Sequence, residues 1–338
     1  MSKNLYITTM EPGGGKSVVA LGIMELLSRR LHKIGFFRPI IPNVERDNNI
    51  QLILSRYNLK LSYEQMYAYR HDDAQHMTAV GKYDALLKNI LDKYKALESQ
   101  SDFVLCEGTD YTGVSSAFEF DFNAEVANNM GCPILVVLNG RTKSPREIIE
   151  AIEFARESFE NRGCTILAMI VNRIAPPSLD LINTHLRQSA VAGVPVYALP
   201  EVPLLGKPSV GEIAAALDGR ILQGEPDRMH REVSDIKIAA MSLPHFLEYI
   251  TDGTLVITPG DRHDIILGSL AAAASETYPN ISGLLLTGGL TPEPSVAKLM
   301  EGFRKSAAVP ILSVDGDTYS TALHAGSVRA ALTPQNDR

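Results

Sequence analysis

Residues 10–17 of the chain read MEPGGGKS, a glycine-rich loop that ends in Lys16 and Ser17. The apolar run Asn4–Thr9 precedes this loop, and apolar residues at helical spacing follow it. Glycines admit the backbone angles that let N–H groups converge on phosphate oxygens, and the start of a helix adds the positive end of its dipole. The stretch therefore predicts a strand, a phosphate-binding loop and a helix.

Each polar residue of the loop has an expected role. Lys16 is predicted to reach the terminal phosphates of a nucleotide, and the Ser17 hydroxyl to ligate Mg²⁺. The usual Gly-x₄-Gly-Lys-Ser/Thr pattern is incomplete, because Met10 stands at its first glycine. A plain glycine-rich turn, or a related fold that no longer binds phosphate tightly, therefore stays open. The backbone N–H groups expected to face phosphate are those of Gly13, Gly14 and Gly15.

Strands and helices alternate along the rest of the chain. Asn48–Gln100 reads as mostly helical, and further helices separate the later strands. This alternation predicts an α/β fold with a P-loop-type parallel sheet, helices on both of its faces, and a smaller α/β domain after it. The apolar segments predicted as strands of the first domain include Ile34–Ile40, Phe103–Glu107, Pro133–Leu138, Thr165–Val171 and Val194–Leu199.

A change of pattern near Gly219–Asp227 predicts a domain boundary. We expect a first domain over residues 1–220 and a second over residues 221–333. Residues 334–338 are polar and turn-prone, which is typical of a linker.

Composition narrows the classes of partner. The chain has 338 residues and a net charge of -7, and it contains no basic tract, so a nucleic-acid partner is not expected. It has no apolar run of about 18 residues, the length of a membrane-spanning helix, and no signal peptide at its start. We therefore expect a cytoplasmic protein without a membrane partner. The three cysteines, Cys106, Cys132 and Cys164, lie among apolar residues and are predicted to be buried thiols.

Three later motifs, together with the loop, resemble dethiobiotin synthetase and the cobyrinic acid a,c-diamide synthases. They are Phe37–Arg38–Pro39, Glu107–Gly108 and Val171–Asn172–Arg173. The resemblance implies ATP as ligand, with Arg38 and Asn172 as nucleotide-binding residues and Glu107 as a second Mg²⁺ ligand beside Ser17. This chain departs from that family in the sequence after Glu107, in Arg38 where the family has lysine, and in Glu11 at the signature-lysine position of related ATPases.

The C-terminal part resembles the DRTGG domain. Its Asp-Arg pair corresponds to Asp261 and Arg262, and its Thr-Gly-Gly stretch to Thr287, Gly288 and Gly289. Both groups follow predicted strands, and the carboxyl ends of parallel strands are where open α/β sheets bind ligands. Three roles stay open for these residues: a ligand site, a contact between subunits, and a purely structural turn.

The two domains in this order resemble the long form of bacterial phosphate acetyltransferase over residues 1–332. That family adds a catalytic domain that converts acetyl-CoA and phosphate to acetyl phosphate and CoA. The resemblance implies a regulatory and assembly region, with its own catalytic domain and further copies of itself as partners. This chain alone is then not expected to be catalytic. An ATP-dependent synthetase and a non-enzymatic oligomerisation scaffold are the alternative hypotheses.

Overall fold

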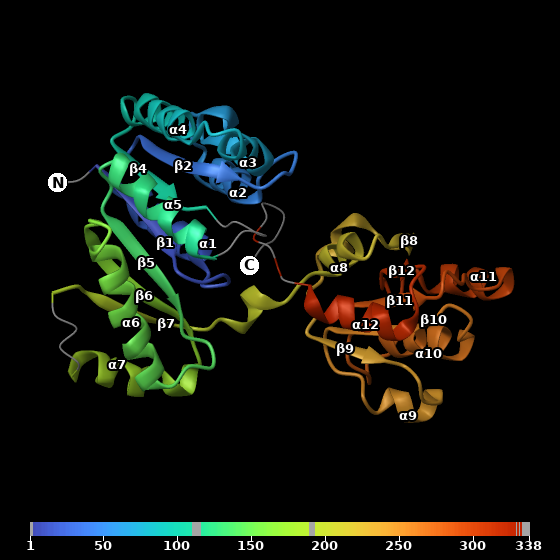
Figure 1. Ribbon diagram of the computed structural model, residues 1–338. Coiled ribbons are helices and arrows are strands. Elements are labelled where there is room, and N and C mark those ends of the chain that lie inside the picture. Colours follow the sequence, from blue (N-terminus) through green and yellow to red (C-terminus); the bar gives the residue numbers. More distant parts are fainter. Residues whose placement is uncertain (1–2, 110–115, 189–192, 329, 331, 333–338) are drawn as a thin grey trace. The chain divides into compact units, whose positions relative to one another are not determined.

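The computed structural model describes residues 3–109, 116–188, 193–328, 330 and 332 (Figure 1). These residues form two compact units, one running to Val202 and the other starting at Pro203. In both units strands alternate with helices along the chain.

The first unit is built around a seven-stranded sheet with the order β3-β2-β4-β1-β5-β6-β7. Every strand pairing in it is parallel. Its strands are β1 (Asn4–Thr9), β2 (Ile34–Ile41), β3 (Tyr67–Arg70), β4 (Phe103–Glu107), β5 (Ile134–Asn139), β6 (Ile166–Ile174) and β7 (Val196–Pro200). Its helices are α1 (Lys16–Ser28), α2 (Asn48–Tyr57), η1 (Tyr63–Gln65), α3 (His71–Ala79), α4 (Tyr83–Glu98), α5 (Ser116–Asn129), α6 (Pro145–Glu160), η2 (Pro176–Ser178) and α7 (Leu179–Gln188).

Side chains of these strands alternate between the two faces of the sheet. Tyr6 belongs to one buried cluster, whereas its neighbours Leu5 and Ile7 belong to another. The first cluster includes residues of α4, α5 and α6, and the second includes residues of α1 and α2. Because helices cover both faces, a central strand is apolar along its length, as in Ile134–Leu138. The predicted fold class, with helices on both faces of a parallel sheet, is confirmed.

The glycine-rich loop lies at the carboxyl edge of this sheet, after its central strand. β1 pairs with β4 on one side and with β5 on the other. The chain goes from β1 to β2, returns to β4, and crosses to β5 on the opposite side of β1. Open α/β sheets bind ligands at the point where the connections leave in opposite directions. The fold thus brings the loops after β1, β2, β4, β5 and β6 to one edge.

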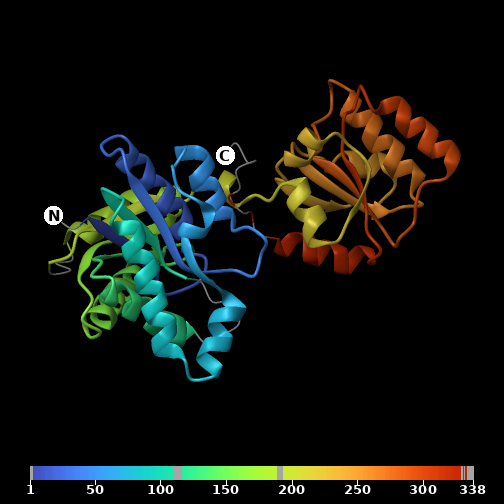
Figure 2. The ribbon, with the colours of Figure 1, turned by 90° about the horizontal axis from the view of Figure 1, so that it is seen from above.

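The second unit has a five-stranded sheet with the order β8-β12-β11-β10-β9. β8 is antiparallel to β12, and the other pairings are parallel. Figure 2 shows helices on both sides of this sheet, in agreement with its two buried clusters. Its elements are η3 (Pro203–Gly206), α8 (Val210–Ala216), β8 (Arg220–Gln223), η4 (Pro226–His230), β9 (Asp235–Ile238), α9 (Leu243–Leu247), β10 (Thr254–Pro259), α10 (His263–Ala274), β11 (Gly283–Thr287), α11 (Pro294–Phe303), β12 (Ile311–Ser313) and α12 (Thr318–Ser327).

Helix α8 packs with the second unit. Val210 and Ile213 share a buried cluster with Leu255 and Leu312 of that unit's sheet. The boundary predicted between residues 220 and 221 is one between domains that fold independently. It stays a proposal, and limited proteolysis would test it.

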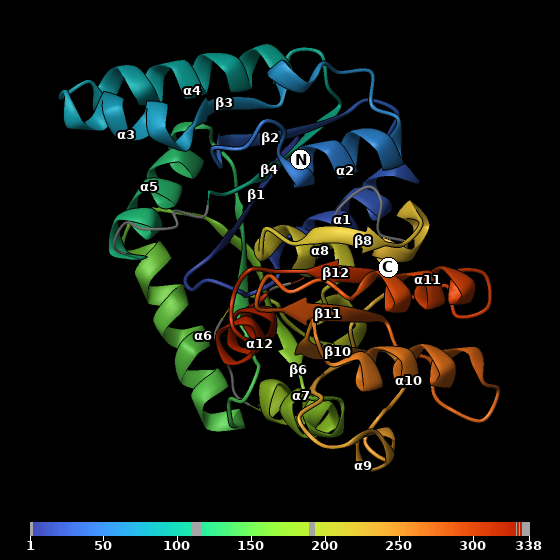
Figure 3. The same cartoon turned by 90° about the vertical axis from the view of Figure 1, so that its right-hand side faces the viewer.

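Two short strands were not foreseen in the sequence. β3 lies within the stretch Asn48–Gln100, which was predicted to be mostly helical, and Figure 3 shows α3 and α4 alongside it. β8 lies within the stretch predicted as a boundary. Each has four residues and forms one edge of its sheet, so it lacks the apolar run of a central strand. None of the helices in the described ranges combines the length and the hydropathy that a membrane crossing requires.

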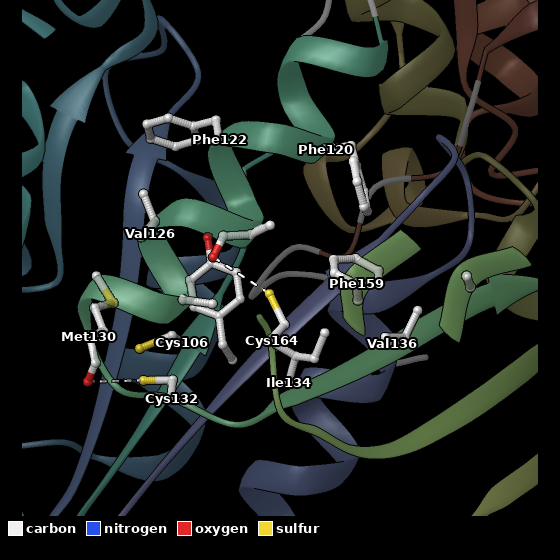
Figure 4. Close-up of a cluster of buried hydrophobic side chains, with 14 of the residues drawn as sticks. Cys106, Phe120, Phe122, Val126, Met130, Cys132, Ile134, Val136, Phe159 and Cys164 are labelled. Carbon is white, nitrogen blue, oxygen red and sulfur yellow. Dashed lines mark hydrogen bonds between the residues drawn. The ribbon is translucent and has the colours of Figure 1, made fainter. Parts of the chain in front are cut away.

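All three cysteines are buried free thiols, as predicted. Figure 4 shows their sulfur atoms among apolar side chains that include Phe122 and Phe159. Burial raises the pKa of the Cys106 thiol well above its ordinary value, and a hydrogen bond with Cys132 adds to this effect. Burial also raises the pKa of Cys164. Because a thiol reacts as the thiolate, burial protects Cys106 and Cys164 in two ways: it restricts access to the sulfur, and it keeps the proton on it.

We expect the three thiols to react with Ellman's reagent at least about 100-fold more slowly than free cysteine, because reaction requires local opening of the core. The measurement is the rate of labelling of the native protein at about pH 8, below the ordinary thiol pKa of about 8.5. In concentrated guanidinium chloride all three should react at once. One thiol that labels rapidly in the native protein would contradict the buried placement.

Candidate phosphate-binding site

The glycine-rich loop connects β1 directly to α1. Gly13 and Gly15 have φ angles of 78° and 81°, in the left-handed region that glycine adopts without a steric penalty. Helix α1 begins at Lys16, and Gly15 precedes it as the capping residue. Since glycine has no side chain, nothing on the cap itself can accept a hydrogen bond from the N–H groups of the first helical turn. The loop therefore has the conformation expected of an anion-binding helix start.

Asn172, at the carboxyl end of β6, holds this loop from one side. Its Nδ2 donates a hydrogen bond of 2.9 Å to the carbonyl oxygen of Gly14. A Cβ atom at position 15 would lie 2.5 Å from the same Nδ2, which is closer than real contacts allow. The next residue, Arg173, has a positive φ of 63°, a conformation that costs energy for a residue with a side chain. The structure thus places Asn172 against the loop backbone. The nucleotide-binding role implied for it by the resemblance stays a prediction.

Four charged side chains are buried around the start of α1. Lys16, Arg38 and Asp47 are each 4% exposed, and Glu107 is fully buried. Arg38 pairs with Asp47, and its Nε lies 3.6 Å from Oε2 of Glu107. Asp47 also caps α2, because its Oδ1 accepts a hydrogen bond of 3.0 Å from the N–H of Ile50. Three of the predicted site residues, Lys16, Arg38 and Glu107, are therefore gathered at this edge of the sheet, together with Ser17.

Asn49, in the first turn of α2, completes this group and was not predicted from the sequence. Its Nδ2 lies 2.8 Å from Oγ of Ser17, and 3.0 Å and 3.1 Å from the two carboxylate oxygens of Glu107. Ser17 itself donates a hydrogen bond of 2.8 Å to Oε1 of Glu107. Asn49 and Asp47 follow β2 without any motif, so no sequence signal pointed to them; only the fold places them here.

The predicted metal ligands can be tested against this geometry. Ser17 and Glu107 are hydrogen-bonded to each other, and Asn49 presents its NH₂ group, not its carbonyl oxygen, to both of them. The cavity that these three residues line has a volume of ≈ 10 Å³, which is room for about one water. No cluster of three or more His, Cys, Asp or Glu side chains suited to a metal occurs within the described ranges. Beside a nucleotide, Mg²⁺ takes most of its six oxygen ligands from water and phosphate, so the fit depends on whether Ser17 and Glu107 are open to it. In this structure both are engaged with Asn49.

Glu11 places a carboxylate in the loop itself, and the loop after β5 neutralises it. Its Oε1 accepts hydrogen bonds from Nζ of Lys143 at 2.6 Å and from the backbone N–H of Asn139 at 3.3 Å. The negative charge of Glu11 is thus balanced by Lys143, a residue that the sequence did not single out.

The DRTGG residues of the second unit lie at the carboxyl ends of two neighbouring strands. Asp261 and Arg262 follow β10, and Thr287 ends β11. The N–H of Gly260 donates a hydrogen bond of 3.2 Å to the carbonyl oxygen of Thr287, which links the two loops. Gly288 and Gly289 have positive φ angles of 82° and 66°. The structure therefore brings the predicted residues into one region.

Arg262 is engaged within this region. Its guanidinium binds both carboxylate oxygens of Asp264 at 2.9 Å and 3.0 Å, and its Nη2 donates to the carbonyl oxygen of Met241 at 3.0 Å. The hydrogen bonds from Arg262 lower the pKa of Asp264. Arg262 therefore braces this region through Asp264, two positions further along the chain. A ligand-binding role of this region stays a prediction.

Two domain families match the chain, one for each part. The AAA domain family matches residues 3–209, and the DRTGG domain family matches residues 212–328. The first match covers more than half of the chain and contains the whole site around Lys16.

Full-length relatives extend beyond this chain. It is 44% identical over 345 residues to a phosphate acetyltransferase of Nitratidesulfovibrio vulgaris, and the similarity covers 100% of this chain but 49% of the relative. It is 35% identical to a phosphate acetyltransferase of Synechocystis, with 100% of this chain and 49% of the relative covered. The chain thus spans about half the length of the curated relatives it matches.

Among solved structures, a GTPase of Pyrococcus abyssi in its apo form is similar with a TM-score of 0.38 and 14% identity. The similarity covers 56% of this chain and 74% of that structure. At these values it carries no conclusion about function.

Proposed function

We propose, since this chain belongs to the AAA domain family and carries a DRTGG domain after it, that it is the regulatory and assembly region of a phosphate acetyltransferase. The parent enzyme would convert acetyl-CoA and phosphate to acetyl phosphate and CoA in a part outside these residues. Within this chain, the glycine-rich loop would bind a nucleotide such as ATP, and the bound state would be passed on to the catalytic part.

One observation carries this proposal: the glycine-rich loop at the carboxyl edge of the sheet ends in a lysine that is buried at the start of a helix. Lys16 stands at the first position of α1, beside the left-handed glycines of the loop. Lys16 is 4% exposed at the start of α1, a position from which it can meet an anion that approaches the loop. Phosphate groups of a nucleotide would supply that anion, with the loop N–H groups as additional donors.

The proposed partners are the catalytic part of the same enzyme and further copies of the chain. A nucleotide can regulate catalysis only if it binds two states of the whole enzyme with different affinities. If copies of the chain form a symmetric oligomer, a change of state in one copy would alter the contacts it makes with the next copy.

Ligand-induced stabilisation tests the proposal. We expect ATP or ADP to raise the Tm of this chain, because a ligand at about 100 times its Kd adds about 2.7 kcal/mol to the stability of the folded state. The measurement is differential scanning calorimetry with ATP, ADP or NADH, and with ribose 5-phosphate as a control for nonspecific phosphate effects. If no nucleotide changes the Tm, the sensing role is wrong and the chain is better described as an oligomerisation scaffold.

A further inference from the structure

We infer that this site binds the phosphate groups of its ligand without a divalent cation, because Asn49 and Arg38 occupy the surroundings of Glu107 that a metal ion would need. The inference rests on the proposed function, in which the loop binds a nucleotide. It replaces the Mg²⁺ site predicted at Ser17 and Glu107.

The first reason is that Glu107 already accepts several hydrogen bonds. Its Oε1 receives Oγ–H of Ser17 at 2.8 Å, and the Asn49 amide reaches Oε1 at 3.0 Å and Oε2 at 3.1 Å. Arg38 adds a guanidinium whose Nε is 3.6 Å from Oε2. A metal ion could bind Glu107 only by displacing these donors from a carboxylate that is fully buried.

The second reason is the orientation of the Asn49 amide. The NH₂ group of Asn49, and not its carbonyl oxygen, faces both carboxylate oxygens of Glu107, which accept its hydrogen bonds. The same NH₂ group lies 2.8 Å from Oγ of Ser17. A divalent cation placed between Ser17 and Glu107 would therefore meet amide hydrogens, which repel it.

The third reason is the balance of buried charge. Two cations, Lys16 and Arg38, and two anions, Asp47 and Glu107, are almost completely buried here. The group is neutral as it stands, so no surplus negative charge attracts a cation. Phosphate, in contrast, would be met by Lys16, the loop N–H groups and the positive end of α1. The loop N–H groups and the start of α1 therefore supply to phosphate the positive charge that Mg²⁺ would otherwise bring.

Isothermal titration calorimetry with ADP and ATP tests this inference on the unmodified chain. We expect the Kd of each nucleotide to agree within about threefold between a buffer with excess Mg²⁺ and a buffer with excess EDTA, a difference below about 0.7 kcal/mol. Binding that is tighter with Mg²⁺ by more than this factor would overturn the inference and leave the proposed function in place. Binding in neither buffer would overturn the proposed function and this inference with it.

One substitution should convert the site. Asn49→Asp replaces the amide donor by a carboxylate next to Ser17 and Glu107, so that a set of oxygen ligands becomes available. We expect nucleotide binding by this variant to become at least about tenfold tighter with Mg²⁺ than with EDTA. Asn48→Asp is the matched control, because it adds the same charge at the neighbouring, exposed position of α2 and should leave binding independent of Mg²⁺.

Circular dichroism of both variants establishes that they are folded. If Asn49→Asp folds and binds nucleotide but shows no Mg²⁺ dependence, Asn49 is not what excludes the metal, and the inference is wrong in its mechanism. If the variant does not fold, the comparison of the two buffers on the unmodified chain still decides the question.

Discussion

Replacing Glu107 by alanine is expected to lower the free energy of unfolding of the first unit by about 3 kcal/mol or more. Glu107 is fully buried, and its removal leaves Lys16 and Arg38 with Asp47 as the one remaining anion of the buried group. It also removes the acceptor of the hydrogen bonds from the half-buried Ser17 and Asn49, and a hydrogen bond to a charged group contributes about 1.5–3 kcal/mol. The loss should appear as a lower midpoint of urea denaturation, followed by far-ultraviolet circular dichroism.

Two further variants identify the cause. Glu107→Gln keeps the shape and one acceptor oxygen but not the charge, so we expect it to lose less stability than the alanine variant. Glu25→Ala removes an exposed carboxylate that pairs with Arg29 and Arg56, and such surface pairs contribute about 0–1 kcal/mol. A Glu107→Ala protein as stable as Glu25→Ala would show that the buried group does not depend on its carboxylate.

Replacing Lys16 by alanine is expected to weaken nucleotide binding by about 100-fold, or about 3 kcal/mol, the upper end for a hydrogen bond to a charged group. Lys16 is the first residue of α1, where a phosphate would also meet the N–H groups of the first turn. The loss would be read as an increase in Kd for ADP by isothermal titration calorimetry. Far-ultraviolet circular dichroism of the same sample would establish that α1 is still formed.

The control for this experiment is Lys33→Ala. Lys33 has an exposed side chain in the same unit and precedes β2, so its removal changes the net charge equally without touching the loop. We expect ADP binding by Lys33→Ala to match that of the unmodified chain. Equal Kd values for Lys16→Ala and Lys33→Ala would mean that phosphate does not bind at this loop.

The loop, its position after the first strand and the α/β class could all be predicted from the sequence. These features depend on local patterns: glycines where φ is positive, an apolar strand, and a helix that starts at Lys16. Glu107 was named through the resemblance of Glu107–Gly108 to a family motif, and the structure has it at the end of the predicted strand.

Asn49, Asp47 and Lys143 could not be predicted in the same way. Each reaches the site from a loop or helix start after β2 or β5, and its role depends on which strand ends are neighbours in the sheet. The strand order β2-β4-β1-β5 is a property of the whole fold, and no sequence pattern near these residues indicates it. The same limit applies to the predicted metal ligands, since the side chain that faces Glu107 comes from a neighbouring part of the fold and not from its own motif.

The position of β12 in the second unit bears on how the chain is made. β12 (Ile311–Ser313) is the last strand of that unit in the sequence, yet it lies between β8 and β11 and joins them. A growing polypeptide that has passed β11 but not reached Ile311 therefore holds β8 with no partner in the sheet. About nine-tenths of the 338 residues must be synthesised before β12 can pair with β8 and β11. During that interval the unpaired edge of β11 is open to other chains, which makes this the stage at which a chaperone would be most useful.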